Sequence, residues 1–519
     1  MSERGRRGLR RAGSGSDKTA RAARPAGARA PAFARFATWM ARPLASFHLV
    51  VTIATLLTLL GLVMVLSASS VEAYTAVGSA YSLFRQQILF ALIGCVLFYL
   101  ALRIPIRRLR QWSFPLFALS VLALFLVLIP GIGTEVQGSR RWIDLGVVSV
   151  QPSEIVKVTL VVWGAHLLAS RRSEQAPLKE ILVPLVPAGM LVCLLVVLEP
   201  NLSTTIALGI VLAALLWFGG LPVRLFVTIA LAGVVAAAVL ALTAGYRSDR
   251  MRAFFNPGED PQGIGYQARQ AMYSLADGGI WGRGLGQSRA KWSYLPNSHN
   301  DFIFAIIGEE LGFLGCALVL GLFALFVYTG LRIATRSVDP FLRLLSATAT
   351  TWITAQALIN VGYVVGLLPV TGLQLPLVSA GGSSLAITLF MFGIIANAAR
   401  HEPEAVAALQ AGQDGRMSRL LRLPKPEPYS PMRAEAARAG ARRGGPRGGG
   451  RAPQRAGARQ GRGGGQPKAA QARAARGGAG KPAPRRRSGE SRGTSSARAT
   501  RAWEPTYPMP HANERGRYR

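Results

Sequence analysis

The sequence predicts an all-α polytopic membrane protein. Half of its 519 residues are hydrophobic and only 16% are charged, which fits a chain that crosses a bilayer repeatedly better than a soluble domain of this length. The formal net charge of +35 is concentrated at the two ends. Residues 1–43 hold 11 basic and 2 acidic side chains, and residues 401–519 hold 26 basic and 8 acidic side chains.

Ten apolar runs each approach the roughly 20 residues that a helix needs to cross the hydrocarbon core. We therefore expect ten transmembrane helices within a membrane domain at residues 45–402. The predicted spans are 48–67, 86–103, 113–130, 152–169, 181–198, 202–218, 223–244, 302–331, 341–365 and 377–399. The fifth and sixth spans are separated only by the tight turn Glu199-Pro200-Asn201.

The distribution of Lys and Arg among the loops predicts the orientation, because basic loops stay on the cytoplasmic side. With both termini cytoplasmic, the outer loops at 68–85, 199–201 and 366–376 carry almost no basic residues. The inner loops are basic, with Arg103, Arg107, Arg108, Arg110, Arg171, Arg172, Lys179, Arg224, Arg332, Arg336 and Arg343.

The two ends of the chain have the composition of disordered, basic tails. Within residues 1–43, apolar and aromatic residues at helical spacing predict a short amphipathic helix near 31–47, lying on the inner membrane surface. Residues 403–519 are predicted to be a disordered, Arg/Gly-rich cytoplasmic tail. Arginine clusters can bind RNA or acidic lipid headgroups, but a solvated tail is the simpler interpretation, and we do not expect a nucleic-acid partner.

Two predicted outer loops are basic, although basic loops usually stay on the cytoplasmic side. Loop 131–151 contains Arg140 and Arg141, and the large extracytoplasmic loop 245–301 lies between the seventh and eighth spans. Long loops cross the membrane largely regardless of charge, so tolerated charge is one interpretation. A site for an anionic ligand is the other. The large loop carries Arg247, Arg250, Arg252, Arg269, Arg283, Arg289 and Lys291.

Asp301 stands where the large loop enters the eighth span, and a carboxylate at the mouth of a membrane helix is costly. It could be the N-cap of that helix or a general base at the outer membrane interface. The two roles are compatible, because a helix N-terminus keeps a carboxylate ionised.

Glu309 and Glu310 lie further inside the same span. As neighbours on one helix they point about 100° apart and cannot both face one cavity. Gly308, Gly312 and Gly315 recur at a spacing that lets another helix approach closely. We therefore expect structural hydrogen bonding from at least one of the two glutamates.

Pro152 is expected to open the fourth span. Glu154 and Lys157 follow, three residues apart on one helix face, and can pair. An ion pair that fixes helix packing and a contact with substrate remain alternatives. In the preceding loop, Arg140 and Arg141 could hold a phosphate, because the guanidinium fork matches phosphate oxygens.

Glycines also mark the outer segment between the last two spans. The stretches Gly366–Gly372 and Leu375–Ser384 predict a re-entrant or turn segment whose glycines permit close packing. A phosphate cradle is less favoured than packing, because no Walker-type lysine follows. Cys95, Cys193 and Cys316 lie in apolar runs without metal-ligand spacing.

Five ordered motifs across residues 45–402 resemble the SEDS (shape, elongation, division and sporulation) family. The carrying motifs are Gly138-Ser-Arg-Arg-Trp-Ile, Gln151-Pro-Ser-Glu-Ile-Val-Lys157, Glu199-Pro200, Asp301-Phe-Ile-Phe with Gly308-Glu-Glu-Leu-Gly312, and Gly366-Leu-Leu-Pro through Gly381-Gly-Ser-Ser384.

The resemblance implies a ten-span peptidoglycan glycosyltransferase that polymerises lipid II at the outer face of the cytoplasmic membrane. It implies Asp301 as the catalytic base, with a divalent cation, Mg or Mn, as a possible cofactor and no organic cofactor. The substrate-binding candidates are Arg140, Arg141, Trp142, Glu154, Lys157, Glu199, Arg250, Lys291 and Ser383.

Within the family, the stretches Asn300–Glu310 and Leu375–Ser384 are more similar to the division type than to the elongation type, and the basic tails are similar to actinobacterial members. This implies a class B penicillin-binding protein, an FtsI-like transpeptidase, as partner, together with other division proteins. Family members usually carry Glu at the position of Asn297 and often carry Asp at the position of Asn201. It is therefore open whether these two positions supply auxiliary acids or metal ligands in this chain.

Two other functions fit the same residues. A transporter that flips lipid-linked precursors suits ionisable groups inside spans, but it should show paired broken helices in repeated halves and polar groups near the midplane. Here the polar groups gather at the outer face, and no internal repeat is evident. A scaffold that recruits a transpeptidase through the tails is compatible with the enzyme.

Overall fold

The computed structural model describes residues 38, 40–136, 139–146, 148–173, 177–243, 251–255, 264–292, 295, 298–413 and 419–430. Nearly all of both predicted tails, including most of the predicted amphipathic helix near 31–47, lies outside these residues.

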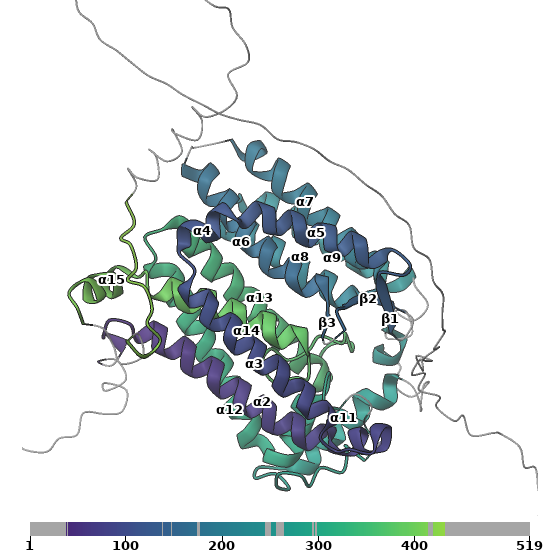
Figure 1. Cartoon of the computed structure of the whole chain (residues 1–519). Coiled ribbons are helices and arrows are strands. Elements are labelled where there is room, and N and C mark those ends of the chain that lie inside the picture. The colour runs from purple at the N-terminus through teal and green to yellow at the C-terminus, as the bar shows by residue number, and fades with distance from the viewer. Residues whose placement is uncertain are drawn as a thin grey trace, which may run out of the picture. The chain divides into compact units, whose positions relative to one another are not determined.

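Long helices make up most of the described chain (Figure 1). Each of the ten predicted spans coincides with one helix. These helices are α2 (Ala45–Val77), α3 (Ser82–Arg103), α5 (Ser113–Leu128), α6 (Pro152–Ser173), α7 (Leu178–Leu198), α8 (Leu202–Phe218), α9 (Val223–Thr243), α12 (Ile303–Arg336), α13 (Pro340–Val364) and α14 (Ser383–Ala399).

Within the described residues, four helices are both long and apolar enough to cross a membrane by themselves: α2, α3, α6 and α12. The bent pair of α14 and α15 (Pro403–Gln410) makes a fifth if it is counted as one span. The chain is therefore a multi-pass membrane protein.

The pattern of exposure on α2 shows why these helices need a membrane. Phe47, Ile53 and Leu57 are completely buried against the bundle. On the same helix, Leu59 and Val63 are about half exposed. Large apolar side chains on an open surface would drive aggregation in water, whereas lipid tails solvate them without cost.

The predicted loop 131–151 is not a loop, so the expectation of an all-α protein is wrong for this stretch. It forms a three-stranded antiparallel sheet of β1 (Gly133–Val136), β2 (Ser139–Asp144) and β3 (Ser149–Val150). Thr134 faces Trp142, and Ile143 faces Val150. Aromatic and β-branched residues favour such pairing, and their short separation lets the strands pair locally.

Three further features differ from the predictions. The large loop contains α11 (Ile264–Gly278), and α14 begins at Ser383 rather than at residue 377. The predicted disordered tail begins too early, because α15 forms within it and buries Ala405 and Leu409. An apolar face one helical turn long is enough to hold this short helix against the bundle.

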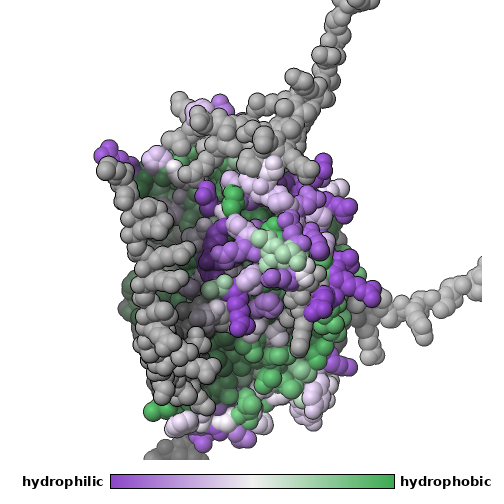
Figure 2. Space-filling model, turned by 90° about the vertical axis from the view of Figure 1, so that its left-hand side faces the viewer, coloured by the Kyte–Doolittle hydropathy of each residue, from purple (hydrophilic) through white to green (hydrophobic). Residues whose placement is uncertain are grey.

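Helix α13 lies at the centre of the arrangement, packed against α6, α8 and α12. Helix α14 packs along α3 and α2. The short helix α4 (Ile106–Gln111) lies at the same end of the bundle as α15 (Figure 1). Figure 2 faces that end and shows hydrophilic residues gathered beside a hydrophobic flank.

Candidate functional site

Asp301 lies in the turn before α12, and its main chain is anchored to α13. Its carbonyl oxygen accepts hydrogen bonds from Asn360 Nδ2 at 3.0 Å and from Tyr363 Oη at 2.8 Å. The N-cap position of α12 belongs to Phe302, so the N-cap interpretation of Asp301 is wrong. What fixes this residue is α13.

The face of α13 that holds Asp301 also holds the segment that follows α13. Trp352, Gln356 and Asn360 are four residues apart and therefore share one helix face. Gln356 donates to the carbonyl of Gln374 at 3.0 Å, and Asn360 donates to the carbonyl of Leu373 at 2.7 Å. Gln356 and Asn360 were not singled out from the sequence. Two carboxamides inside a predicted span are costly there and could have indicated a functional role.

Lys157 and Glu154 form the predicted ion pair, with Nζ 2.9 Å from Oε1 and side chains only 1% and 9% exposed. The Lys157 ammonium also lies over the ring of Trp352, 5.1 Å from its centroid, where a cation–π interaction stabilises it. Trp352 and Asn360 are eight residues apart, about 12 Å along the α13 axis. The environments of Lys157 and Asp301 are therefore joined through α13 rather than by direct contact.

The glycine-rich segment between α13 and α14 also connects the two environments. Its Ala380 N–H donates to the carbonyl of His299, two residues before Asp301, at 3.0 Å. Ser383 is buried, and its Oγ accepts a hydrogen bond of 3.4 Å from the N–H of Gln151, just before α6. These contacts favour the packing interpretation of this segment, and they place Ser383 beside the start of α6.

The two arginines of β2 have different partners. Arg141 donates through Nε to the carbonyl of Glu199 at 3.0 Å and through Nη2 to the carbonyl of Pro200 at 2.6 Å. Arg140 pairs at 3.3 Å with Glu135, and both of these side chains are substantially exposed. Trp142, next on the strand, is half-buried. Arg141 thus ties the sheet to the turn between α7 and α8, while Arg140 faces the surface.

Glu199 is completely buried in that turn, and neither of its carboxylate oxygens accepts a hydrogen bond from a residue that the structure describes. Burial raises the pKa of this carboxyl to about 8, against a smaller opposing effect of the Arg141 charge. Asn201 caps α8 by accepting from the N–H of Thr204 at 3.2 Å. An asparagine at this position therefore has a structural role of its own.

Glu309 and Glu310 hold the large loop, which confirms their structural interpretation. Glu309 accepts from the N–H of Arg289 at 2.6 Å and from Ser288 Oγ at 2.7 Å. Glu310 accepts from Ser67 Oγ at 2.6 Å, and its Oε1 lies 3.9 Å from Lys291 Nζ. We call these two carboxylates and their partners the glutamate clamp.

A break in α12 lets the loop dock beside the clamp. Gly312 has a φ of 68° and a ψ of −165°, which interrupts the helix. The freed carbonyls of Glu309 and Glu310 accept from the N–H groups of Arg283 and Gly284, both at 2.9 Å. Loop backbone thus replaces the missing helical hydrogen bonds, as buried polar groups require.

A further pair next to Asp301 was not foreseen: His299 Nδ1 lies 3.0 Å from Glu72 Oε2. Arg250 and Asn297 lie outside the described residues, so their predicted roles are untested. Within the described residues, no three His, Cys, Asp or Glu side chains converge on a point that could hold a metal.

The fold and the site together define an integral membrane protein with a charged, polar site where its helices meet a folded loop. The chain belongs to the FtsW/RodA/SpoVE family of cell cycle proteins, whose sequence profile matches residues 47–404. This confirms the resemblance read from the motifs.

Curated relatives agree with the family. A protein from Mycobacterium tuberculosis named "Probable peptidoglycan glycosyltransferase FtsW" is 58% identical over 404 residues, covering 78% of this chain and 77% of the relative. "Stage V sporulation protein E" from Bacillus subtilis is 38% identical, covering 68% of this chain and 96% of the relative.

Solved structures share the fold. The rod-shape-determining protein RodA of Thermus thermophilus matches with a TM-score of 0.51 and 27% identity, over 70% of this chain and 99% of RodA. A chain of a peptidoglycan synthase complex that coordinates polymerization and crosslinking matches with a TM-score of 0.56 and 28% identity, over 70% of this chain and 99% of that chain.

Proposed function

We propose that this protein is a peptidoglycan glycosyltransferase that polymerises lipid II during cell division. The names of its most similar curated relatives support the activity. The observation that carries the proposal is the anchoring of Asp301 by α13, since a base must be held in a fixed position to act. Glycan synthesis during elongation is the alternative role for the same chemistry.

The proposed topology has ten spans and both termini in the cytoplasm, in agreement with the charge of the loops. In this topology the sheet, the large loop and Asp301 lie on the extracytoplasmic side of the cytoplasmic membrane. A disaccharide headgroup on a lipid carrier would reach the site there, with its lipid tail passing sideways between helices.

In the proposed reaction, the 4-hydroxyl of one GlcNAc attacks C1 of the MurNAc of a second lipid II. The new O4–C1 bond forms as the bond from C1 to the diphosphate oxygen breaks, and the hydroxyl proton passes to the Asp301 carboxylate. Undecaprenyl diphosphate leaves with the bonding electrons. Because diphosphate is already a good leaving group, no paired acid is needed, and single displacement inverts the anomeric centre.

Cations near the site would stabilise the charge on the departing diphosphate. Arg140 is the most accessible candidate, because its guanidinium is substantially exposed and pairs only with the exposed Glu135 among the described residues. Lys157 is buried with Glu154, so it would stabilise that charge from inside the helix bundle. Lys291 belongs to the glutamate clamp, and its proposed role is to hold the loop in position over the substrate.

A divalent cation fits this site only as a bridge between the protein and the substrate. The described residues hold no cluster of three acidic, histidine or cysteine side chains, and Mg²⁺ in proteins is commonly bound by one or two carboxylates plus substrate phosphates. Glu199, whose carboxylate oxygens have no hydrogen-bond partner among the described residues, would hold it only after releasing the proton that its buried carboxyl keeps. Such a cation would neutralise charge on the diphosphate.

The proposed partner is a class B penicillin-binding protein that crosslinks the strands this chain makes, within the division machinery. The match to a chain of a peptidoglycan synthase complex supports a partner of this kind.

The function is tested by glycan polymerisation from purified lipid II, with the protein reconstituted together with its cognate penicillin-binding protein. Asp301→Asn and Asp301→Ala should abolish polymer formation while the thermal melting temperature stays near that of wild type. Asp144→Asn, which alters an exposed carboxylate of β2, is the matched control and should retain activity. Full activity of both Asp301 variants would refute the assignment.

A lipid II transporter is the second candidate, favoured by the buried pair of Glu154 and Lys157 inside α6. Reconstituted vesicles separate the two functions. Transbilayer movement of labelled lipid II that persists in Asp301→Asn, without any polymer from the wild type, would support the transporter.

A further inference from the structure

A cavity of about 250 Å³ lies away from the site described above, between two pairs of packed helices. Helix α3 packs along α14, and α5 packs along α6. The cavity separates these two pairs and is closed at one end by α4. Asp301 and the glutamate clamp take no part in its lining.

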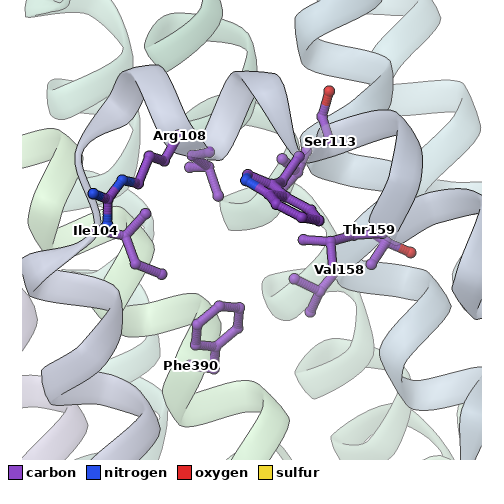
Figure 3. Close-up of a pocket in the computed structure, with 10 residues that line it drawn as sticks. Ile104, Arg108, Ser113, Val158, Thr159 and Phe390 are labelled. Carbon is purple, nitrogen blue, oxygen red and sulfur yellow. The ribbon is translucent and has the colours of Figure 1, made fainter. Parts of the chain in front are cut away.

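The walls of the cavity are apolar. Figure 3 shows Phe390 of α14 opposite Val158 and Thr159 of α6, with the side chains turned toward the space between them. The Thr159 hydroxyl is engaged with Ser120 Oγ at 2.7 Å. Water needs two to four polar partners to occupy a cavity, and these walls do not supply them. The fitting occupant is a hydrocarbon chain.

The rim of the cavity is cationic and aromatic. Arg108 and Trp112 lie there, Trp112 being 59% exposed, and Figure 3 shows the Arg108 guanidinium turned toward Ile104. Tryptophan at such a rim is typical of the membrane–water interface. Beneath a basic rim, an apolar slot matches a ligand that has both an anionic head and an apolar tail.

Arg108 is available for such a head, whereas Arg103 and Arg110 are engaged and the exposed Arg107 does not line the cavity. Arg110 binds Asp339 and stacks on Phe341, 4.9 Å from the ring centroid. Arg103 lies over the ring of Tyr99 at 5.6 Å. Arg108 has no ion pair with any residue that the structure describes, and its side chain is exposed at the rim.

The depth of the cavity matches one leaflet. Its rim lies where α4 meets α5, and its floor reaches Phe390, which is seven residues from Ser383 and nine from Ala399 at the ends of α14. The floor is thus about 10–13 Å from either end of that helix. One leaflet contributes about half of the roughly 30 Å hydrocarbon core. The cavity is therefore deep enough to hold most of the length of one acyl chain.

We propose that this cavity binds one acyl chain of an anionic phospholipid, with the lipid phosphate on Arg108. In the proposed topology this is a lipid of the cytoplasmic leaflet. The bound chain fills the gap between the α3–α14 and α5–α6 pairs and contacts Val158, the residue after Lys157. The site goes beyond the proposed function and does not depend on polymerisation.

The headgroup contact is tested with the full chain in phosphatidylcholine nanodiscs that contain a minor fraction of phosphatidylglycerol, with retained lipid counted by native mass spectrometry. Arg108→Gln should weaken phosphatidylglycerol retention about five-fold, the effect of one basic side chain near an anionic surface. Arg107→Gln removes the same charge from an exposed neighbour that does not line the cavity, and should retain the lipid as wild type does.

The acyl-chain contact is tested by filling the slot. Leu116→Trp, at a lining position, should reduce lipid retention, while Leu119→Trp, on the same helix and outside the lining, should leave it unchanged. Equal retention by wild type, Arg108→Gln and Leu116→Trp would overturn the proposal, as would preferential capture of undecaprenyl phosphate over phosphatidylglycerol. Repeating the measurement in Asp301→Ala should give the wild-type result, which separates this site from the catalytic assignment.

Discussion

Asn360 Nδ2 donates a hydrogen bond of 3.0 Å to the main-chain carbonyl of Asp301, across 59 residues of sequence. The same amide bonds to the carbonyl of Leu373 at 2.7 Å. One buried side chain therefore holds both the turn that presents the proposed base and the glycine-rich segment between α13 and α14. The position of Asp301 depends on α13 more than on the helix that follows it.

Asn360→Ala should lower kcat while changing KM little. Losing both hydrogen bonds frees the Asp301 turn, and a misplacement of about 1 Å can cost on the order of a hundredfold in rate. Tyr363→Phe removes one hydroxyl from the same carbonyl and should have a smaller effect in the same direction. Steady-state lipid II polymerisation gives both constants. A rise in KM alone in both variants would show that α13 does not position the base.

Lys157→Met should destabilise the protein strongly, because it leaves the buried carboxylate of Glu154 without its partner. Breaking a buried pair from one side costs about 3–5 kcal/mol. The double variant Lys157→Met with Glu154→Gln should recover most of the melting temperature. If the recovered protein is still inactive, Lys157 contacts the substrate; if activity returns as well, the pair is structural.

Glu309→Gln should loosen the loop that the glutamate clamp holds. The lost charge weakens hydrogen bonds from Ser288 and the main chain of Arg289, and bonds to charged groups contribute about 1.5–3 kcal/mol each. Hydrogen exchange in residues 286–291 should rise about ten- to a hundredfold. Glu404→Gln, at an exposed ion pair with Arg336, is the control and should leave that exchange unchanged.

Gly312→Ala should destabilise the break in α12. A Cβ there would lie 2.3 Å from Gly282 N, at a φ of 68° that L-residues rarely adopt, so about 1–3 kcal/mol of strain is expected. Gly321→Ala is the matched control further along α12, where a Cβ meets nothing within 4 Å. Thermal melting should fall for the first and stay equal or rise for the second.

Stability should depend on pH through Glu199. Its pKa is about 8 in the folded chain, against 4.5 for an unperturbed glutamate. Between these values the folded chain keeps a proton that the unfolded chain has released. The free energy of unfolding should therefore decrease as pH rises from about 4.5 to about 8.

The measurement for Glu199 is thermal melting near pH 6 and near pH 9. The wild type should melt lower at the higher pH, and Glu199→Gln, which mimics the protonated form, should reduce that difference. Glu180→Gln, at an exposed carboxylate, is the control and should leave that difference unchanged. An identical pH dependence in wild type and Glu199→Gln would show that this carboxyl is not the titrating group.

Sequence by itself determined the features that depend on local composition. Apolar runs of about 20 residues, the length that a bilayer requires, located ten of the helices that the structure describes. The spacing of three residues brought Glu154 and Lys157 together on one face. Asp301 stood out because a carboxylate at a membrane border is costly. The motifs were specific enough to predict the family before any fold was known.

Only the tertiary structure decided which distant groups meet. Glu310 pairs with Ser67 across 243 residues of sequence, and Arg141 bonds to the carbonyl groups of a turn almost 60 residues away. Local periodicity carries no information on such partners, because they follow from how whole helices pack. The loop that folded as a sheet was missed for a related reason, since strand pairing rather than single-residue preference stabilises it. The role of α13 is visible only in the structure, where Asn360 and Tyr363 hold the main-chain carbonyl of Asp301.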